Sequence, residues 1–316
     1  MKSSKKYFSA NFCVLYLVSC VFLCGCSDYF KNDYSDNSPT SGKLKIYYDE
    51  GLHLHVVNQV YTFETFYPEA HIEIFSTSED AAVQALYSDS CETIVISRLL
   101  NNKEKSAFAS KNYSIVPTAV AKSGVALITN INTPLQHLSF EQVVDLLTKP
   151  FFCLDSLSNE IKLNVIFDKN NSSVLHYLQD SVLKGKPFSF NCKILISTQE
   201  SINFVAQNKN TVAFIDFAWL SDVDDSITKA NRDKVKFIPV SKANSNQYEL
   251  PSQSSFKLET YPFTRIIYVI KKTGEFSLAK GFETFVAGPK GQTTFLKQGL
   301  LPTKQQERSI KVTLGQ

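Results

Sequence analysis

Short apolar segments recur along this chain, and most are followed by residues with helical spacing. The segments TIVIS (93–97), NVIF (164–167), KILIS (193–197) and VAFID (212–216) lack strict alternation of apolar and polar residues. Such runs are typical of parallel strands that are covered by helices on both faces. This feature restricts the chain to folds in which helices pack on a central sheet.

The region from residue 43 onward shows the order of these elements. KLKIYY is followed by a helical stretch, then by HIEIFS, a second helical pattern and TIVIS. The first helical stretch has apolar residues at three- and four-residue spacing, namely Leu52, Val56, Val60, Phe63 and Tyr67. We therefore predict an α/β protein with a central, mostly parallel sheet flanked by helices.

Two places depart from this order. YSIVPTAVAKSGVALIT (113–129) contains two strand-like pieces with no helix between them, and YPFTRIIYVIKK (261–272) is a long strand far downstream. Two extended crossings that flank a middle segment indicate two lobes joined by a hinge. We expect one lobe from residues 42–121 plus 263–316 and the other from residues 122–262.

The first 25 residues (1–25) have the features of a bacterial lipoprotein signal peptide. Three lysines precede an apolar run, 12–23, that is too short and too interrupted to span a bilayer comfortably. The following LCGC resembles a lipobox, which makes Cys26 the predicted lipidation site; an ordinary membrane anchor is the alternative. Residues 26–41 would then be a flexible polar tether. We expect a protein anchored in the bacterial cell envelope, facing the periplasm or the exterior.

Charge and cysteine content exclude other classes. Removal of the signal peptide takes three lysines and no acidic residue, so the formal charge falls from +3 to zero. A basic surface for nucleic acid is therefore not expected. Outside the signal region, Cys91, Cys153 and Cys192 are widely spaced and make neither a disulfide framework nor a CxxC metal site. We interpret them as small apolar residues, and one disulfide pair remains an alternative.

The succession of several motifs resembles the phosphate-binding proteins of ABC transporters. VPTAVAKSGVALITNINTPLQHLSFEQVVDLLTK (116–149) resembles the stretch in which that family's chain crosses between lobes and enters a helix. TIVISRLLNNKEK (93–105) resembles its strand ending in Ser-Ser-Arg, and YPFTRIIYVIKK resembles its return strand. AKGFETFVAGPKGQTTFLKQGLLP (279–302) resembles its last helix pair. Together these motifs cover nearly all of residues 43–302.

The resemblance implies a periplasmic-binding-protein fold of the second type. It also implies that phosphate or a similar small oxyanion is held between the lobes and delivered to an ABC transporter permease, with no catalysis and no cofactor. An oxyanion removed from water needs many donors at once, and free N–H groups in the first turn of a helix supply them. The candidate ligand-binding residues at such strand-to-helix junctions are Glu50, Gly51, Leu52, Ser78, Ser97, Arg98, Asn171, Ser172 and Ser173.

Several of these positions have a structural alternative. Asp49 and Glu50 either cap a helix or accept the proton of hydrogen phosphate. Ser78 either caps its own helix or donates to the ligand. Arg98 is either a solvated charge or a bidentate clamp on the oxyanion, and Asp216 either caps a helix or contacts the ligand.

The segment DKNNSSVL (168–175) departs from the family, which commonly has Asp-Arg-x-Ser-Gly-Thr-Arg at this junction. The aspartate and the hydroxyls are present, but the glycine is missing and apolar residues, predicted to be core, replace the arginine. Lys169 or Arg98 are the two sources considered for the missing charge. The loss also supports a second hypothesis, a structural or partner-binding envelope lipoprotein that keeps the fold without a ligand.

Catalytic and metal patterns are weak. Residues two apart do not share a helix face, so His53 and His55 do not predict a metal pair. An envelope hydrolase would need a serine aligned with a base such as His176, and no Ser-His-Asp order, Walker loop or zincin motif is present.

Overall fold

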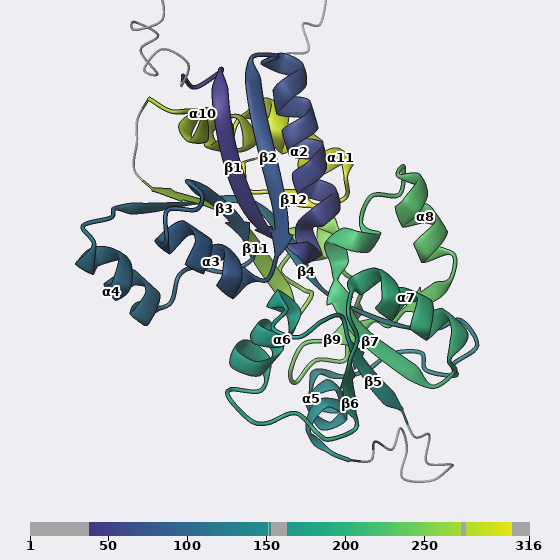
Figure 1. Ribbon diagram of the computed structural model, residues 1–316. Coiled ribbons are helices and arrows are strands. Elements are labelled where there is room, and N and C mark those ends of the chain that lie inside the picture. Colours follow the sequence, from purple (N-terminus) through teal and green to yellow (C-terminus); the bar gives the residue numbers. More distant parts are fainter. Residues whose placement is uncertain (1–37, 151, 153–162, 273–275, 305–316) are drawn as a thin grey trace, which may run out of the picture.

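The computed structural model describes residues 38–150, 152, 163–272 and 276–304 (Figure 1). The predicted signal peptide, Cys26, most of the predicted tether and Cys153 lie outside the described residues.

The predicted fold class is confirmed: the protein is two-lobed and α/β, with helices packed on both sides of its sheet (Figure 1). One lobe contains β1 (Gly42–Asp49), η1 (Glu50–Leu52), α2 (His53–Phe66), β2 (Ala70–Thr77), α3 (Glu79–Tyr87), β3 (Thr93–Ile96), α4 (Asn102–Ser110), β11 (Thr264–Lys272), α10 (Leu278–Val286), α11 (Pro289–Lys297) and β12 (Leu301–Pro302). The other contains α5 (Phe140–Thr148), β5 (Asn164–Phe167), α6 (Ser173–Tyr177), η2 (Leu178–Val182), β6 (Cys192–Ile194), α7 (Thr198–Gln207), β7 (Thr211–Asp216), η3 (Phe217–Leu220), α8 (Ser226–Arg232), β8 (Val235–Phe237), β9 (Val240–Ser241), β10 (Tyr248–Glu249) and α9 (Gln253–Lys257).

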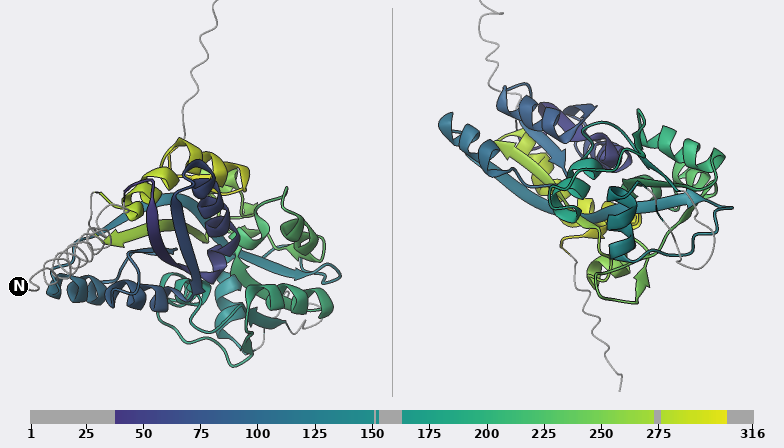
Figure 2. Two further views of the ribbon diagram at one scale, coloured as in Figure 1. Left: turned by 45° about the horizontal axis from the view of Figure 1, so that its top comes forward. Right: turned by 90° about the horizontal axis from the view of Figure 1, so that it is seen from below.

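Strand β4 (Ile115–Asn130) belongs to both lobes. The strand order is β2-β1-β3-β11-β4-β7-β5-β6, and β8 and β12 also pair with β4. Its residues 115–124 pair antiparallel with β11, whereas residues 125–129 pair antiparallel with β7. Figure 2 shows this long strand running from one lobe into the other. Pairs β1–β2, β1–β3, β5–β6 and β5–β7 are parallel, which agrees with the prediction of a mostly parallel sheet.

The two strand-like pieces predicted around residues 121–124 are one continuous strand. Pairing with β11 continues through this segment, where Ser123 lies opposite Arg265 and Gly124 opposite Thr264. Because the neighbouring strand supplies hydrogen bonds throughout, the chain extends without a break.

The predicted helical stretch is confirmed as η1 and α2, and its apolar face is buried. Leu52, Val56, Val60 and Phe63 are all at most 5% exposed. They join a large core that extends over both lobes, while a smaller core holds α3 and α4 against β3. Helix starts follow the sequence: Ser139 and Gln142, for example, form a capping box at α5.

Segment KILIS does not match the expectation of a covered strand. Only its first part pairs, as β6, and Ile196 is 81% exposed. Because β6 ends the strand order, one of its sides has no neighbouring strand to continue the sheet.

Cysteine and membrane predictions are tested in part. Cys91 and Cys192 are both free thiols. Within the described ranges, no helix has the length and apolar character needed to cross a membrane.

Candidate oxyanion-binding site

Carboxyl ends of parallel strands from both lobes meet where the lobes join. Asp49 ends β1, Ser97 follows β3, Asp168 follows β5 and Asp216 ends β7. All four residues are buried. In open α/β sheets, ligands bind outside the carboxyl ends of the strands, which makes this junction the candidate site.

Four polar side chains lie on one face of four neighbouring strands, and we call them the polar row: Ser97, Arg265, Ser123 and Asp216. On β11, Val269 pairs with Val95 of β3, so Arg265 and Ser97 share that face by alternation. Arg265 pairs directly with Ser123. Asp216 pairs with Val125, two residues from Ser123. The polar row therefore crosses the sheet from one lobe to the other at the level of the hinge.

Hydrogen bonds connect the polar row to both lobes through Ser173. Arg265 makes an ion pair with Asp216, and Ser123 Oγ donates to Asp216 Oδ1 at 3.1 Å. Arg265 Nη1 donates to Ser173 Oγ at 3.0 Å, and that hydroxyl donates to Asp49 Oδ2 at 2.5 Å. Ser173 thus joins the end of β1 in one lobe to the start of α6 in the other.

A second set of contacts closes the junction beside η1. Thr198 Oγ1 donates to Glu50 Oε2 at 2.8 Å, and Trp219 Nε1 donates to the Glu50 carbonyl at 3.3 Å. A Cβ atom at Gly51 would lie 3.0 Å from the Asp216 Cβ atom. Glycine is needed there because the backbone of one lobe approaches the other so closely.

Buried carboxyl groups dominate the electrostatics of the junction. Burial raises the pKa of Asp49 well above its usual value, and the neighbouring Glu79 raises it further. Burial also raises the pKa of Glu79 and of Asp216, and it raises the pKa of Asp168 to about 6. The positive charge of Arg265 opposes the rise at all four groups. Arg265 is therefore their shared counter-ion.

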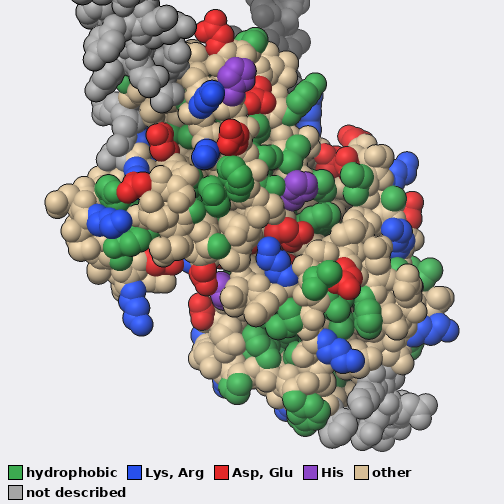
Figure 3. All heavy atoms as spheres, viewed as in Figure 1, with side chains coloured by type: hydrophobic (Ala, Val, Ile, Leu, Met, Phe, Trp, Pro, Cys, Tyr) green, Lys and Arg blue, Asp and Glu red, His purple; other side chains and the backbone are tan. Residues whose placement is uncertain are grey.

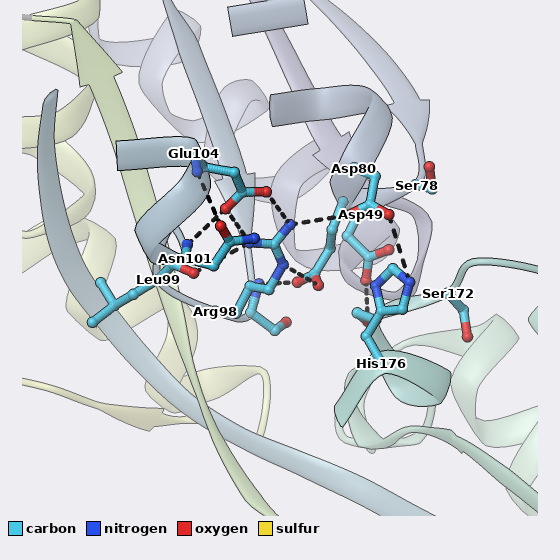
Figure 4. Close-up of polar contacts among 12 residues, drawn as sticks. Asp49, Ser78, Asp80, Arg98, Leu99, Asn101, Glu104, Ser172 and His176 are labelled. Atoms are coloured by element: carbon cyan, nitrogen blue, oxygen red, sulfur yellow. Dashed lines mark hydrogen bonds and ion pairs between the residues drawn. The ribbon is translucent and has the colours of Figure 1, made fainter. Parts of the chain in front are cut away.

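Arg98 is surrounded by acidic side chains. Figure 4 shows its guanidinium turned toward Glu104 and Asp80. Its Nη1 lies 2.8 Å from Glu104 Oε2, its Nη2 lies 3.0 Å from Asp80 Oδ1, and its Nε lies 3.3 Å from Glu79 Oε2. Every nitrogen of the guanidinium thus has a carboxylate partner.

The predicted serine and asparagine ligands have different surroundings. Ser78 and Ser172 are N-caps, since their hydroxyls accept from Ala81 N at 3.3 Å and Leu175 N at 3.2 Å. Asn171 is exposed, with φ of 55°. Of the nine candidates, the structure brings together Glu50, Gly51, Ser97 and Ser173 with the polar row.

Two buried polar atoms near Glu79 have no hydrogen-bond partner among the described residues. One is Ser97 Oγ, although Ser97 N donates to Glu79 Oε1 at 2.7 Å. The other is Arg265 Nε. They are two of ten such side-chain atoms among the described residues, and they leave unused donor capacity at the junction.

The surface near α3 and α6 is hollowed between the lobes, with acidic side chains at its edge (Figure 3). There His176 Nε2 lies 3.6 Å from Asp80 Oδ2. The His53 and His55 side chains have separate partners. His53 Nδ1 lies 2.7 Å from the Tyr48 hydroxyl, whereas the buried His55 has its Nε2 3.2 Å from Ser221 Oγ. Over the part of the chain that the structure describes, no cluster of three or more His, Cys, Asp or Glu is arranged to hold a metal ion.

Comparisons with known proteins identify the family and the fold of this chain. A family model described as the PBP superfamily domain matches residues 48–290. The chain belongs to the PBP superfamily. The predicted family resemblance is thereby confirmed. A search of curated proteins gave no match.

Solved structures show the same PBP fold. A phosphate ABC transporter substrate-binding protein from Clostridium perfringens, with bound phosphate, has a TM-score of 0.70 at 21% identity, over 83% of this chain and 100% of the other. An ABC-type phosphate transport receptor from Vibrio cholerae has a TM-score of 0.63 at 15% identity, over 83% of this chain and 100% of the other. At these identities the comparisons establish the fold.

The prediction from sequence omitted Arg265 from the candidate ligands. It lies within the quoted strand YPFTRIIYVIKK, where a charged residue interrupts an apolar segment. A buried arginine requires an acidic partner, so this position was the available signal. Asp49 and Asp216 were considered as caps: Asp216 does accept from Ala218 N at 2.9 Å, whereas Asp49 makes no side-chain cap bond.

Proposed function

We propose that this protein is an extracytoplasmic solute-binding protein whose lobes close on phosphate or a similar small oxyanion for ABC-type uptake. It is not an enzyme in this account. Its anchor is a lipid on Cys26, so that it works in the bacterial cell envelope beside its permease. The lobes consist of residues 42–121 plus 263–316 and residues 122–262, and they move about the crossing strands.

One observation supports this function above the others: the guanidinium of Arg265, buried at the carboxyl ends of strands from both lobes, donates to Ser173 Oγ and shares a sheet face with Ser97. Hydroxyl and guanidinium donors are the groups that a tetrahedral oxyanion requires. The first N–H groups of α3 and the backbone at Gly51 and Leu52 add donors at the same junction.

Glu50 and Asp49 provide acceptors beside these donors. A protonated oxyanion such as hydrogen phosphate offers an O–H that a carboxylate accepts. A fully ionised oxyanion such as sulfate offers none and is repelled by the carboxylates. The site therefore favours phosphate over sulfate.

Thermal unfolding with added anions tests the proposal. A ligand that binds only the native state raises the melting temperature as its concentration passes the dissociation constant. We expect phosphate at millimolar concentration to raise the melting temperature, and sulfate at the same ionic strength to leave it unchanged. Equal shifts with both anions would contradict the proposed selectivity.

A ligand-free structural or partner-binding lipoprotein is the second candidate function. The observation that favours it is the direct Asp49–Ser173 bond, because the side chains of the protein already satisfy each other there. In that case, replacing Ser97 and Ser173 with alanine changes stability alone, and an envelope partner still co-purifies with the variant. Loss of anion binding in the same variant would refute this second candidate.

A further inference from the structure

We propose that Arg265 supplies the positive charge for the bound oxyanion, in place of the arginine that the 168–175 segment lacks. This inference rests on the proposed function and goes beyond it by naming the cationic ligand. Neither source considered from the sequence, Lys169 or Arg98, has the required geometry.

The guanidinium of Arg98 has no free N–H donor for an anion. Its Nε, Nη1 and Nη2 each contact a different carboxylate, and Nη1 also donates to the Leu99 carbonyl at 3.2 Å. Lys169 is half-buried, and its charge acts on Glu50, whose pKa it lowers against the effect of burial. The nitrogens of Arg98 are therefore committed to carboxylates of the protein, and Lys169 carries a single ammonium group with no planar fork for an oxyanion.

Arg265 differs because only one of its nitrogens contacts a carboxylate. Its Nη2 pairs with Asp216, its Nη1 donates to the neutral hydroxyl of Ser173, and its Nε has no partner among the described residues. A guanidinium carries five N–H donors in a planar fork. The geometry leaves several of them for an oxyanion.

The position of Arg265 suits a ligand held between two lobes. It lies on β11 opposite Ser123 of β4, where the two crossing strands pair. Its side chain is 1% exposed. When the lobes separate, Ser173 and Asp216 move away with the other lobe, and the guanidinium of Arg265 faces the opening beside Asp49.

The contact between Ser173 and Asp49 indicates what the opened site accepts. The Asp49 carboxylate is a planar oxyanion, and it lies 2.5 Å from a hydroxyl that also receives the Arg265 donor. A phosphate oxygen offers Ser173 and Arg265 the same acceptor chemistry. When phosphate accepts from Ser173, the Asp49 carboxylate is released and can accept the proton of hydrogen phosphate.

Calorimetric titration with inorganic phosphate tests this inference. Removing Arg265 alone would leave Asp216 buried and unpaired, so the main variant is the charge-neutral double substitution Arg265→Gln with Asp216→Asn. Loss of a charge-assisted hydrogen bond predicts a dissociation constant raised about 10- to 100-fold. Arg265→Lys keeps the charge and the Asp216 pair but loses the fork, and we expect it to weaken binding several-fold.

Two further arginine variants complete the experiment. Arg232→Gln, which removes an arginine that donates to the Leu220 carbonyl and lies over the Phe237 ring, is the matched control and should bind as the unsubstituted protein does. Arg98→Gln tests the rival source of charge. The inference is overturned if Arg98→Gln abolishes binding, or if the folded Arg265 variants bind within twofold of the unsubstituted protein.

The outcomes separate the inference from the function on which it rests. If the unsubstituted protein binds no phosphate, the proposed function fails first, before any variant is compared. If the double variant does not fold, as judged by circular dichroism, Arg265→Lys decides: unchanged affinity overturns the inference, and weakened affinity supports it.

Discussion

Ser173 Oγ lies 2.5 Å from Asp49 Oδ2 and connects the first turn of α6 in one lobe to the end of β1 in the other. The two residues are 124 positions apart in sequence. Arg265 donates to the same hydroxyl from a crossing strand. One hydroxyl group therefore contacts both lobes and the hinge, which makes it the structural centre of the candidate site.

Replacing Ser173 with alanine should destabilise the closed protein. The change leaves buried Asp49 without its donor and Arg265 Nη1 without its acceptor, and we expect the free energy of unfolding to fall by about 1–3 kcal/mol. Urea denaturation measures this. The exposed Ser254 in α9 provides the control, since Ser254→Ala should change stability by less than about 0.5 kcal/mol. Equal small effects of the two substitutions would contradict the prediction.

Gly51→Ala should hold the lobes apart. The added Cβ would lie 3.0 Å from both the Asp216 Cβ atom and Asp49 Oδ2, so the backbone of η1 must move away from β7. We expect a larger radius of gyration by small-angle X-ray scattering. Gly185→Asn is the control, because a Cβ there meets nothing within 4 Å and asparagine tolerates its positive φ. An unchanged radius for Gly51→Ala would show that the contact does not limit closure.

His55 should make the protein less stable in mild acid. Burial lowers its pKa from 6.5 to about 4, while its Nε2 lies 3.2 Å from Ser221 Oγ. Between these pH values the unfolded chain binds more protons than the native protein, so stability decreases as the pH falls, by about 3 kcal/mol in total. The measurement is chemical denaturation at pH 7, 5.5 and 4. His55→Gln should remove this contribution, and an unaltered pH profile would refute the assignment.

Asp168 should make the protein less stable as the pH rises. Burial raises its pKa from 3.8 to about 6, so between these values the native protein binds more protons than the unfolded chain. Stability then decreases as the pH rises through this window, by about 3 kcal/mol for this group. In the same denaturation series, Asp168→Asn should gain stability relative to the unsubstituted protein as the pH rises from 4 to 7. A constant difference between the two proteins would contradict the shifted pKa.

Fold class followed from the sequence because it depends on local patterns. The spacing of Leu52, Val56, Val60 and Phe63 defines a helix face, and apolar runs such as VAFID define covered strands. Segment KILIS was misjudged because coverage depends on the neighbouring strand, and no local pattern shows that β6 ends the sheet.

The site was predictable only in part, for a related physical reason. Ser97 and Ser173 were found because they follow strands, and the carboxyl ends of parallel strands meet. Arg265 was not selected, because its role depends on pairing between β11 and strands that are far away in sequence. The carboxylates around Arg98 come from α3 and α4 and depend on how these helices pack, which is a tertiary property.

Isothermal titration of the protein with inorganic phosphate tests the central claim most directly, because it measures binding of the proposed ligand without any substitution. The account predicts one bound phosphate per chain with a dissociation constant below one millimolar, about −4.1 kcal/mol or more favourable. Absence of heat change up to millimolar phosphate, together with no binding of other small oxyanions, would contradict it and would leave the ligand-free envelope protein as the better account.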